Sequence, residues 1–187
     1  MMKSIILYDS MSGNTTKVAE TIHCALTAKS MTTDLVKVDK EVTVDPFDYD
    51  LIFIGSPVIS WLPTPTLMDF VKKTMKECNQ QGMIKPSSPI IPGKFGMSFG
   101  TFAGPHIGEQ EAIPMTMWLN SFLGHLGYAV LDHLLVVGRR NNPPAHWPEI
   151  NKNGRLGDIE DRPNDADLLG IENRIKGVVD SLSAWRS

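Results

Sequence analysis

Short, almost continuously apolar runs alternate along this chain with segments in which apolar residues recur at every third or fourth position. The apolar runs cover residues 4–8, 35–38, 51–54, 94–99 and 128–137, and the helical pattern covers residues 15–29, 67–78, 115–126 and 168–185. A strand with one face in water alternates polar and apolar residues, so continuous apolar runs indicate a parallel sheet with helices on both faces. The pattern therefore predicts an α/β fold with a five-stranded parallel sheet.

Length and composition restrict the classes of protein that this chain can represent. The 187 residues fit a single domain over residues 1–187, and the net charge of −3 offers no basic excess for nucleic acid. Cys24 and Cys78 form no CxxC pair, so we expect two small core residues and no metal site. The apolar runs are too short for a transmembrane helix, and the start lacks a signal-peptide pattern. We expect a cytoplasmic protein with no nucleic-acid and no membrane partner.

The loops after the first, third and fourth strands are the candidate sites, because parallel sheets bind ligands beyond the carboxyl ends of their strands. The first loop joins a strand directly to a helix and contains Ser10, Met11, Ser12, Gly13, Asn14 and Thr15. Its hydroxyls, its glycine and the unpaired amides of the first helical turn suit a phosphate, without any arginine. The alternative is an ordinary loop in which Ser12 or Asn14 caps the helix.

This loop contains neither the Gly-Lys-Ser/Thr of nucleoside triphosphate sites nor the GxGxxG of dinucleotide sites. It resembles the phosphate loop of the flavodoxin family, Ser/Thr-x-Ser/Thr-Gly-Asn-Thr. The five specified positions of this pattern are matched by Ser10, Ser12, Gly13, Asn14 and Thr15. The resemblance, to flavodoxins and NAD(P)H-dependent FMN oxidoreductases, implies a three-layer α/β/α sandwich with strand order 2-1-3-4-5. It also implies FMN as the cofactor.

The loop after the third strand resembles the flavin-contacting segment of the same family. Trp61 is the first candidate to stack on the flavin ring, because tryptophan has the largest aromatic face. Pro57, Val58 and Ser60 are expected to line the ring edge, mostly through backbone groups. The alternative for Trp61 is burial under a proline-rich loop.

The loop after the fourth strand resembles the second flavin-contacting segment. The small residues Gly100, Thr101 and Gly104 let the main chain approach a planar ligand, and Phe102 is a candidate to cover the second face of the ring. The family often has Tyr or Trp in this region, so Phe102 as a core residue is an equal alternative. His106 is a candidate to stabilise reduced flavin, against the alternative of a solvated loop histidine.

Residues 139–163 are rich in Asn, Pro, Gly and charge, and they predict a long loop. Arg139 and Arg140 are candidates to pair with an anionic substrate or with the phosphate of a nicotinamide cofactor, and His146 with Trp147 to form a lid. The alternative is a plain surface loop.

Three functions are compatible with these features. The first is an FMN-binding protein that performs electron transfer or flavin-dependent oxidoreduction, with a redox partner protein and no catalytic side chain of its own. The second is an NAD(P)H-dependent quinone or FMN reductase, with a nicotinamide cofactor as partner. The third is a non-redox module that binds another phosphate or a protein. Flavodoxins are, by the resemblance, strongly acidic, which a charge of −3 matches poorly. A homodimer is left open.

Overall fold

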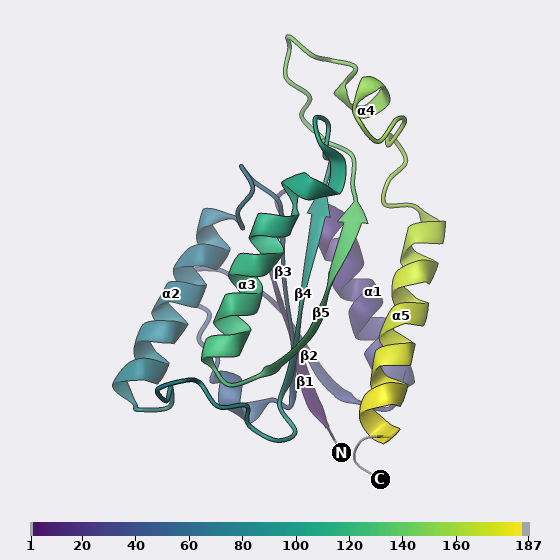
Figure 1. Cartoon of the computed structure of the whole chain (residues 1–187). Helices are drawn as coiled ribbons and strands as arrows, with labels where there is room; N and C mark the ends of the chain where they lie inside the picture. The colour runs from purple at the N-terminus through teal and green to yellow at the C-terminus, as the bar shows by residue number, and fades with distance from the viewer. Residues whose placement is uncertain (1, 185–187) are drawn as a thin grey trace.

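All five strands lie in one parallel sheet in the computed structural model, which describes residues 2–184 (Figure 1). The strands are β1 (Lys3–Tyr8), β2 (Thr32–Lys37), β3 (Leu51–Pro57), β4 (Phe95–Phe102) and β5 (Ala129–Val137). Their order in the sheet is β2-β1-β3-β4-β5, and every neighbouring pair is parallel. The predicted fold class and strand order are confirmed.

Helices cover both faces of this sheet. They are α1 (Asn14–Ala28), α2 (Pro65–Gln80), α3 (Ile113–His125) and α5 (Asp165–Ala184), with the short α4 (Ile150–Asn153) and the 3-10 turns η1 (Pro46–Asp48) and η2 (Gly108–Glu111) between them. In Figure 1, α1 and α5 lie on one face, and α2 and α3 lie on the other. None of the helices described in residues 2–184 is long and apolar enough to cross a membrane.

Successive strand residues point to opposite faces and so supply two separate cores. Ile6, Phe53 and Met97 belong to the core under α1 and α5, whereas Ile5 and Ile52 belong to the core under α2 and α3. All five side chains have no exposed surface. This two-sided burial is the reason that the strand sequences show no alternation.

Two details differ from the sequence prediction, and a third concerns a residue that the structure does not describe. β4 continues to Phe102, because β3 and β5 flank it as far as Thr101 and Phe102 respectively, so Gly100 to Phe102 are strand residues and not loop residues. Cys24 is exposed on α1 and is not a core residue, whereas Cys78 is buried as predicted. Trp185, predicted in the last helix, lies outside the described residues.

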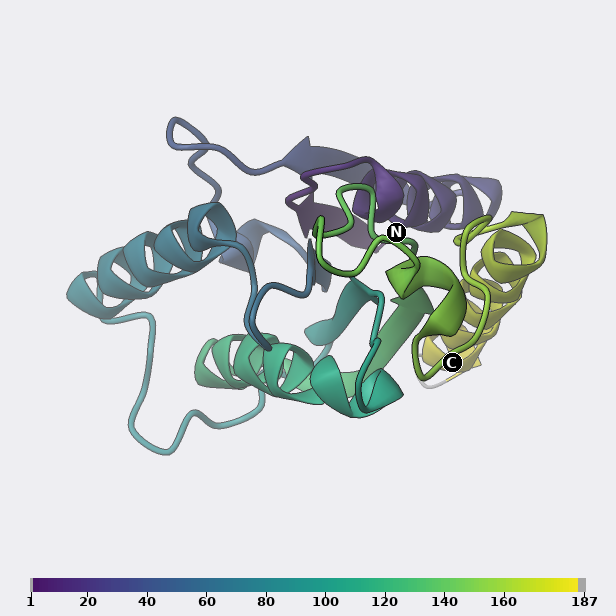
Figure 2. The ribbon, with the colours of Figure 1, turned by 90° about the horizontal axis from the view of Figure 1, so that it is seen from above.

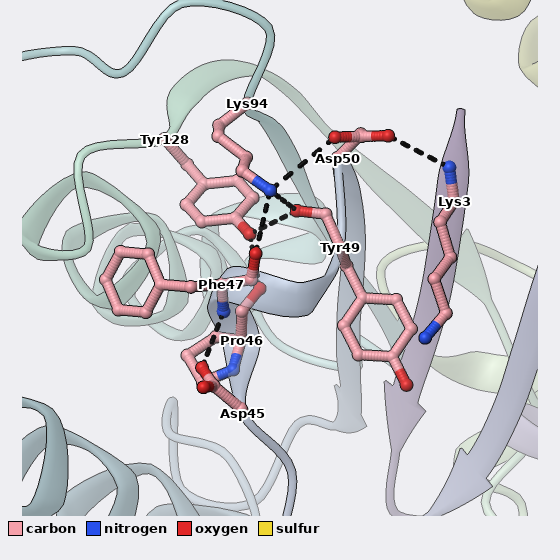
Figure 3. Close-up of polar contacts among 8 residues, drawn as sticks. All are labelled: Lys3, Asp45, Pro46, Phe47, Tyr49, Asp50, Lys94 and Tyr128. Atoms are coloured by element: carbon pink, nitrogen blue, oxygen red, sulfur yellow. Dashed lines mark hydrogen bonds and ion pairs between the residues drawn. The ribbon is translucent and has the colours of Figure 1, made fainter. Parts of the chain in front are cut away.

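Polar groups at the amino edge of the sheet clamp the turn η1 (Figure 3). Lys94 Nζ donates to the carbonyls of Phe47 and Tyr49 at 2.8 and 2.7 Å and lies 3.5 Å from an Asp50 carboxylate oxygen. The hydroxyl of Tyr128 lies 2.6 Å from Pro46 O and 2.7 Å from Tyr49 O. Because its partners are main-chain carbonyls at the edge opposite the candidate loops, this cluster has a structural role.

The segment after β5 is partly structured. It leaves the sheet at Gly138, rises above the carboxyl ends of the strands, contains α4 and returns to α5 (Figure 1). Seen from above, it lies between the start of α1 and the turn before α3 (Figure 2). Residues 139–163 therefore belong to the same edge as the three candidate loops.

Candidate functional site

The first loop forms a tight bend between β1 and α1. Ser10 is buried, and its hydroxyl accepts hydrogen bonds from the amides of Gly13 and Thr16 at 3.2 and 3.3 Å. Gly13 has φ 94°, a left-handed conformation that favours glycine, and a Cβ there would meet no atom within 4 Å. The glycine is thus required by the backbone conformation of the bend and not by crowding.

Four amides of this bend are available for an anion. Within residues 2–184, the amides of Met11, Ser12, Asn14 and Thr15 have no protein acceptor. They precede or open α1, where the helix dipole favours negative charge. Met11 is 71% exposed, so the bend is open to solvent on that side. The donor set therefore fits a phosphate group.

Buried hydroxyls connect the bend to the neighbouring strands. Thr15 Oγ1 lies 2.8 Å from Thr101 Oγ1 at the end of β4, and both side chains are buried. The carboxylate of Asp9 accepts from the Ser10 amide at 2.7 Å and from the Thr64 hydroxyl at 2.6 Å. Thr64 is the N-cap of α2, so Asp9 links the bend to the helix that follows β3. Sequence reasoning assigned no role to Asp9 or Thr64.

The loop after β3 exposes its tryptophan. Ile59 and Leu62 exchange two backbone hydrogen bonds of 2.9 and 3.0 Å, and the residues between them, Ser60 and Trp61, have φ 48° and 68°. Two positive φ angles inside such a turn are the signature of type I′, which is costly for residues other than glycine. Trp61 is 58% exposed, so burial beneath the prolines is excluded.

This tryptophan turn stands on the sheet itself. Pro57 is the last residue of β3, and the amide of Val58 donates to the Thr101 carbonyl at 2.9 Å. The Ser56 hydroxyl donates to Pro57 O at 2.9 Å and accepts from the Thr64 amide at the same distance. The turn that carries Trp61 is thereby attached to β4 and to the start of α2.

The residues predicted after β4 have different roles in the structure. Gly100 lies inside the strand, where a Cβ would approach Met115 Cε to 2.2 Å, so close packing on α3 explains this glycine. Phe102 is buried and therefore a core residue, not an exposed stacking surface. Gly104 has φ 51° and lies too close to the Gly108 carbonyl for any side chain. His106 is exposed, with its ring centroid 5.2 Å from that of Trp147.

The segment after β5 contacts the first loop through two asparagines. Asn14 Nδ2 donates to the Arg139 carbonyl at 2.9 Å, and Asn141 Nδ2 donates to the Ser12 carbonyl at 3.1 Å. Further along, the Arg155 amide donates to the Pro105 carbonyl at 2.8 Å. Trp147, which the sequence predicted to form a lid together with His146, contacts His106 of the β4 loop, with ring centroids 5.2 Å apart. Asn141 carried no signal in the sequence.

The loops after β1, β3 and β4 meet at one edge of the sheet. At this edge the connections that follow neighbouring strands turn to opposite faces of the sheet. The connection from β1 leads to α1 on one face, and that from β3 leads to α2 on the other. Such a switch point between adjacent strands is the usual ligand site of open α/β sheets. This geometry defines the chain as an α/β protein of the flavodoxin fold.

Comparisons with known proteins agree with this class. Residues 5–84 match the model of the flavodoxin domain family. A flavodoxin from the domain Archaea has a TM-score of 0.63 and 18% identity, over 97% of this chain and 99% of that chain. Flavodoxin 2 from Bacillus cereus has the same score and identity, over 96% and 99%. A WrbA-like flavodoxin from Agrobacterium tumefaciens has a TM-score of 0.62 and 15% identity, over 98% and 99%.

The chain therefore has a flavodoxin-like fold, and the match to the family model covers residues 5–84. The family match contains the loops after β1 and β3, and the structural likeness extends over the remainder of the fold. No curated protein sequence matches the chain.

Proposed function

We propose that this protein binds FMN at the carboxyl edge of its sheet and uses it for electron transfer or flavin-dependent oxidoreduction. The observation that carries the proposal is the pairing of two features on adjacent strands. After β1 lies a bend whose amides at Met11, Ser12, Asn14 and Thr15 have no acceptor within residues 2–184, and after β3 lies the exposed Trp61. One feature suits a phosphate, and the other suits a flat apolar ring.

FMN would supply the redox chemistry, since its ring accepts and releases electrons. The residues of this chain would bind the FMN and fix its orientation. The bend from Ser10 to Thr15 holds the phosphate with amides and hydroxyls, and Trp61 covers one face of the ring. The contact between Asp9 and Thr64 and the contact between Thr15 and Thr101 keep the bend rigid relative to the start of α2 and to β4. A rigid support reduces the entropy lost when the cofactor binds.

Titration of FMN with the purified protein, followed by flavin fluorescence, tests this proposal. We expect quenching with a dissociation constant in the micromolar range or below, and a weaker constant for riboflavin, which lacks the phosphate. Absence of quenching by either flavin at micromolar protein would falsify the proposal and favour a non-redox module.

A reductase that takes hydride from a nicotinamide cofactor is the second candidate. The ordered segment over residues 139–163 favours it, because this segment adds a wall to the edge where a second substrate would enter. Stopped-flow mixing of the FMN-loaded protein with NADH or NADPH separates the two roles. Rapid bleaching of the flavin by either nucleotide indicates a reductase. A flavin that neither NADH nor NADPH reduces, but that a ferredoxin-type donor does reduce, indicates an electron carrier.

A further inference from the structure

In the part of the chain that the structure describes, Arg139 has no carboxylate partner, and its backbone contacts the phosphate bend. Arg162 pairs with Asp167, and Arg174 pairs with Asp132. Arg139 has no such pair among residues 2–184, although it is exposed and directly follows Gly138 at the end of β5. Within residues 2–184, the charge of this guanidinium is therefore not neutralised by a carboxylate.

The backbone of Arg139 is fixed against the bend. Its carbonyl accepts from Asn14 Nδ2 at 2.9 Å, and its amide donates to the Arg162 carbonyl at 2.9 Å. A Cβ on Gly138 would lie 2.8 Å from Asn14 Nδ2, so a larger residue there would displace the Asn14 side chain from this contact. The start of the segment is thereby held at the first turn of α1.

The side chain of Arg139 is also tied to the bend, through Asn141. Arg139 Nε donates to Asn141 Oδ1 at 2.6 Å, and Asn141 Nδ2 donates to the Ser12 carbonyl at 3.1 Å. One carboxamide thus contacts both the guanidinium and the loop predicted to bind phosphate. Nε is used in this contact, which leaves the two terminal nitrogens for another acceptor.

We propose that Arg139 supplies a charged hydrogen bond to the phosphate of the bound flavin, and that Asn141 is the residue that positions it. This inference rests on the proposed function and adds to it. The sequence predicts that the bend holds phosphate with neutral donors, whereas in the structure Asn141 links the Arg139 side chain to Ser12 of the bend, more than 120 positions away. Arginine suits this role because its planar donors match phosphate oxygens.

Arg140 provides a matched control in the same segment. It is exposed like Arg139, but its Nε donates to the Asn142 carbonyl at 3.3 Å. Its backbone is held by Asn151, which accepts from the Arg140 amide at 2.8 Å and donates to its carbonyl at 2.9 Å. Arg140 is thus held within its own segment and, among residues 2–184, makes no hydrogen bond or ion pair with the phosphate bend.

The test measures dissociation constants for FMN and riboflavin with the wild type, Arg139→Gln and Arg140→Gln. Loss of one charge-assisted hydrogen bond is expected to weaken FMN binding by about 10- to 100-fold in Arg139→Gln. Riboflavin binding is expected to stay unchanged, because it has no phosphate. Arg140→Gln is expected to change either constant by less than about threefold. Asn141→Ala alone is expected to weaken FMN binding relative to the wild type. The same substitution added to Arg139→Gln is expected to cause no further loss.

Each other outcome is decisive. If Arg139→Gln weakens FMN and riboflavin equally, or changes neither, the guanidinium does not hold the phosphate and the inference is wrong. An equal effect of Arg140→Gln would indicate general electrostatic attraction and would also overturn it. A wild type that binds both flavins with the same affinity overturns the inference and the phosphate role of the bend, but leaves flavin binding by the protein in place. A wild type that binds neither overturns the proposed function as well.

Discussion

The hydroxyls of Thr15 and Thr101 lie 2.8 Å apart inside the protein, although 86 residues separate them in sequence. Thr15 belongs to the first turn of α1, and Thr101 lies near the end of β4. Each hydroxyl can donate and accept, so one of them donates to the other and both have a hydrogen-bond partner inside the protein. This contact fixes the phosphate bend relative to the centre of the sheet.

The first prediction concerns this pair. Thr101→Val leaves the buried Thr15 hydroxyl without its partner, and we expect the free energy of unfolding to fall by about 1–3 kcal/mol. Thr15→Val should lower the free energy of unfolding by a similar amount. The double variant, with two apolar side chains of matching shape, should recover a large part of the loss. Urea denaturation of the four proteins measures the coupling, and strictly additive single effects would contradict a direct contact.

The second prediction concerns Trp61. Trp61→Ala removes the exposed aromatic face and should weaken flavin binding by about 1–3 kcal/mol. FMN and riboflavin should be affected alike, because the indole contacts the ring and not the phosphate. Leu62→Ala, the next position in the same turn, serves as the control and should alter the constants less than about threefold. Equal effects of the two substitutions would remove Trp61 from the site.

The third prediction separates stability from binding. Tyr128→Phe removes the hydroxyl that contacts the Pro46 and Tyr49 carbonyls, and it should lower the free energy of unfolding by about 1–3 kcal/mol. FMN affinity should stay unchanged, because the cluster lies at the opposite edge of the sheet. Lys85→Ala, which loses one exposed hydrogen bond to Gly82, should cost less than about 0.5 kcal/mol. A Tyr128→Phe protein as stable as the wild type would show that the clamp contributes little.

The fourth prediction concerns alkaline pH. Burial, followed by the hydrogen bond to Asp34, raises the pKa of Tyr49 from 10.0 to about 12. Between these values the unfolded chain has already released the phenol proton while the folded chain retains it. This contribution to stability is therefore complete below about pH 10 and is lost as the pH rises towards about 12.

Denaturation curves recorded across that pH range check this expectation. Tyr49→Phe has no phenol to titrate, so its stability should fall less steeply than that of the wild type. Parallel slopes for the two proteins would show that Tyr49 titrates at the same pH in the folded and unfolded chains.

Local sequence patterns were sufficient for the fold class, the five strands, the four main helices and the candidate loops. A buried parallel strand and an amphipathic helix each have a signature within ten to twenty residues, because burial acts on every residue of the element. The bend from Ser10 to Thr15 was likewise visible, since its glycine and hydroxyls are consecutive. The predicted end of the fourth strand was wrong. Gly100, Thr101 and Phe102 were predicted in the following loop, but pairing with strands on both sides extends β4 to Phe102.

Tertiary structure decided which of these residues face each other. Only the folded chain shows that Trp61 is exposed on a strained turn, that Gly100 serves packing on Met115, and that Cys24 faces solvent. The contacts of Arg139 and Asn141 with the phosphate bend join positions more than 120 residues apart. Such pairs leave no trace in local periodicity, because they depend on how the loops at the carboxyl edge approach one another after the sheet has formed.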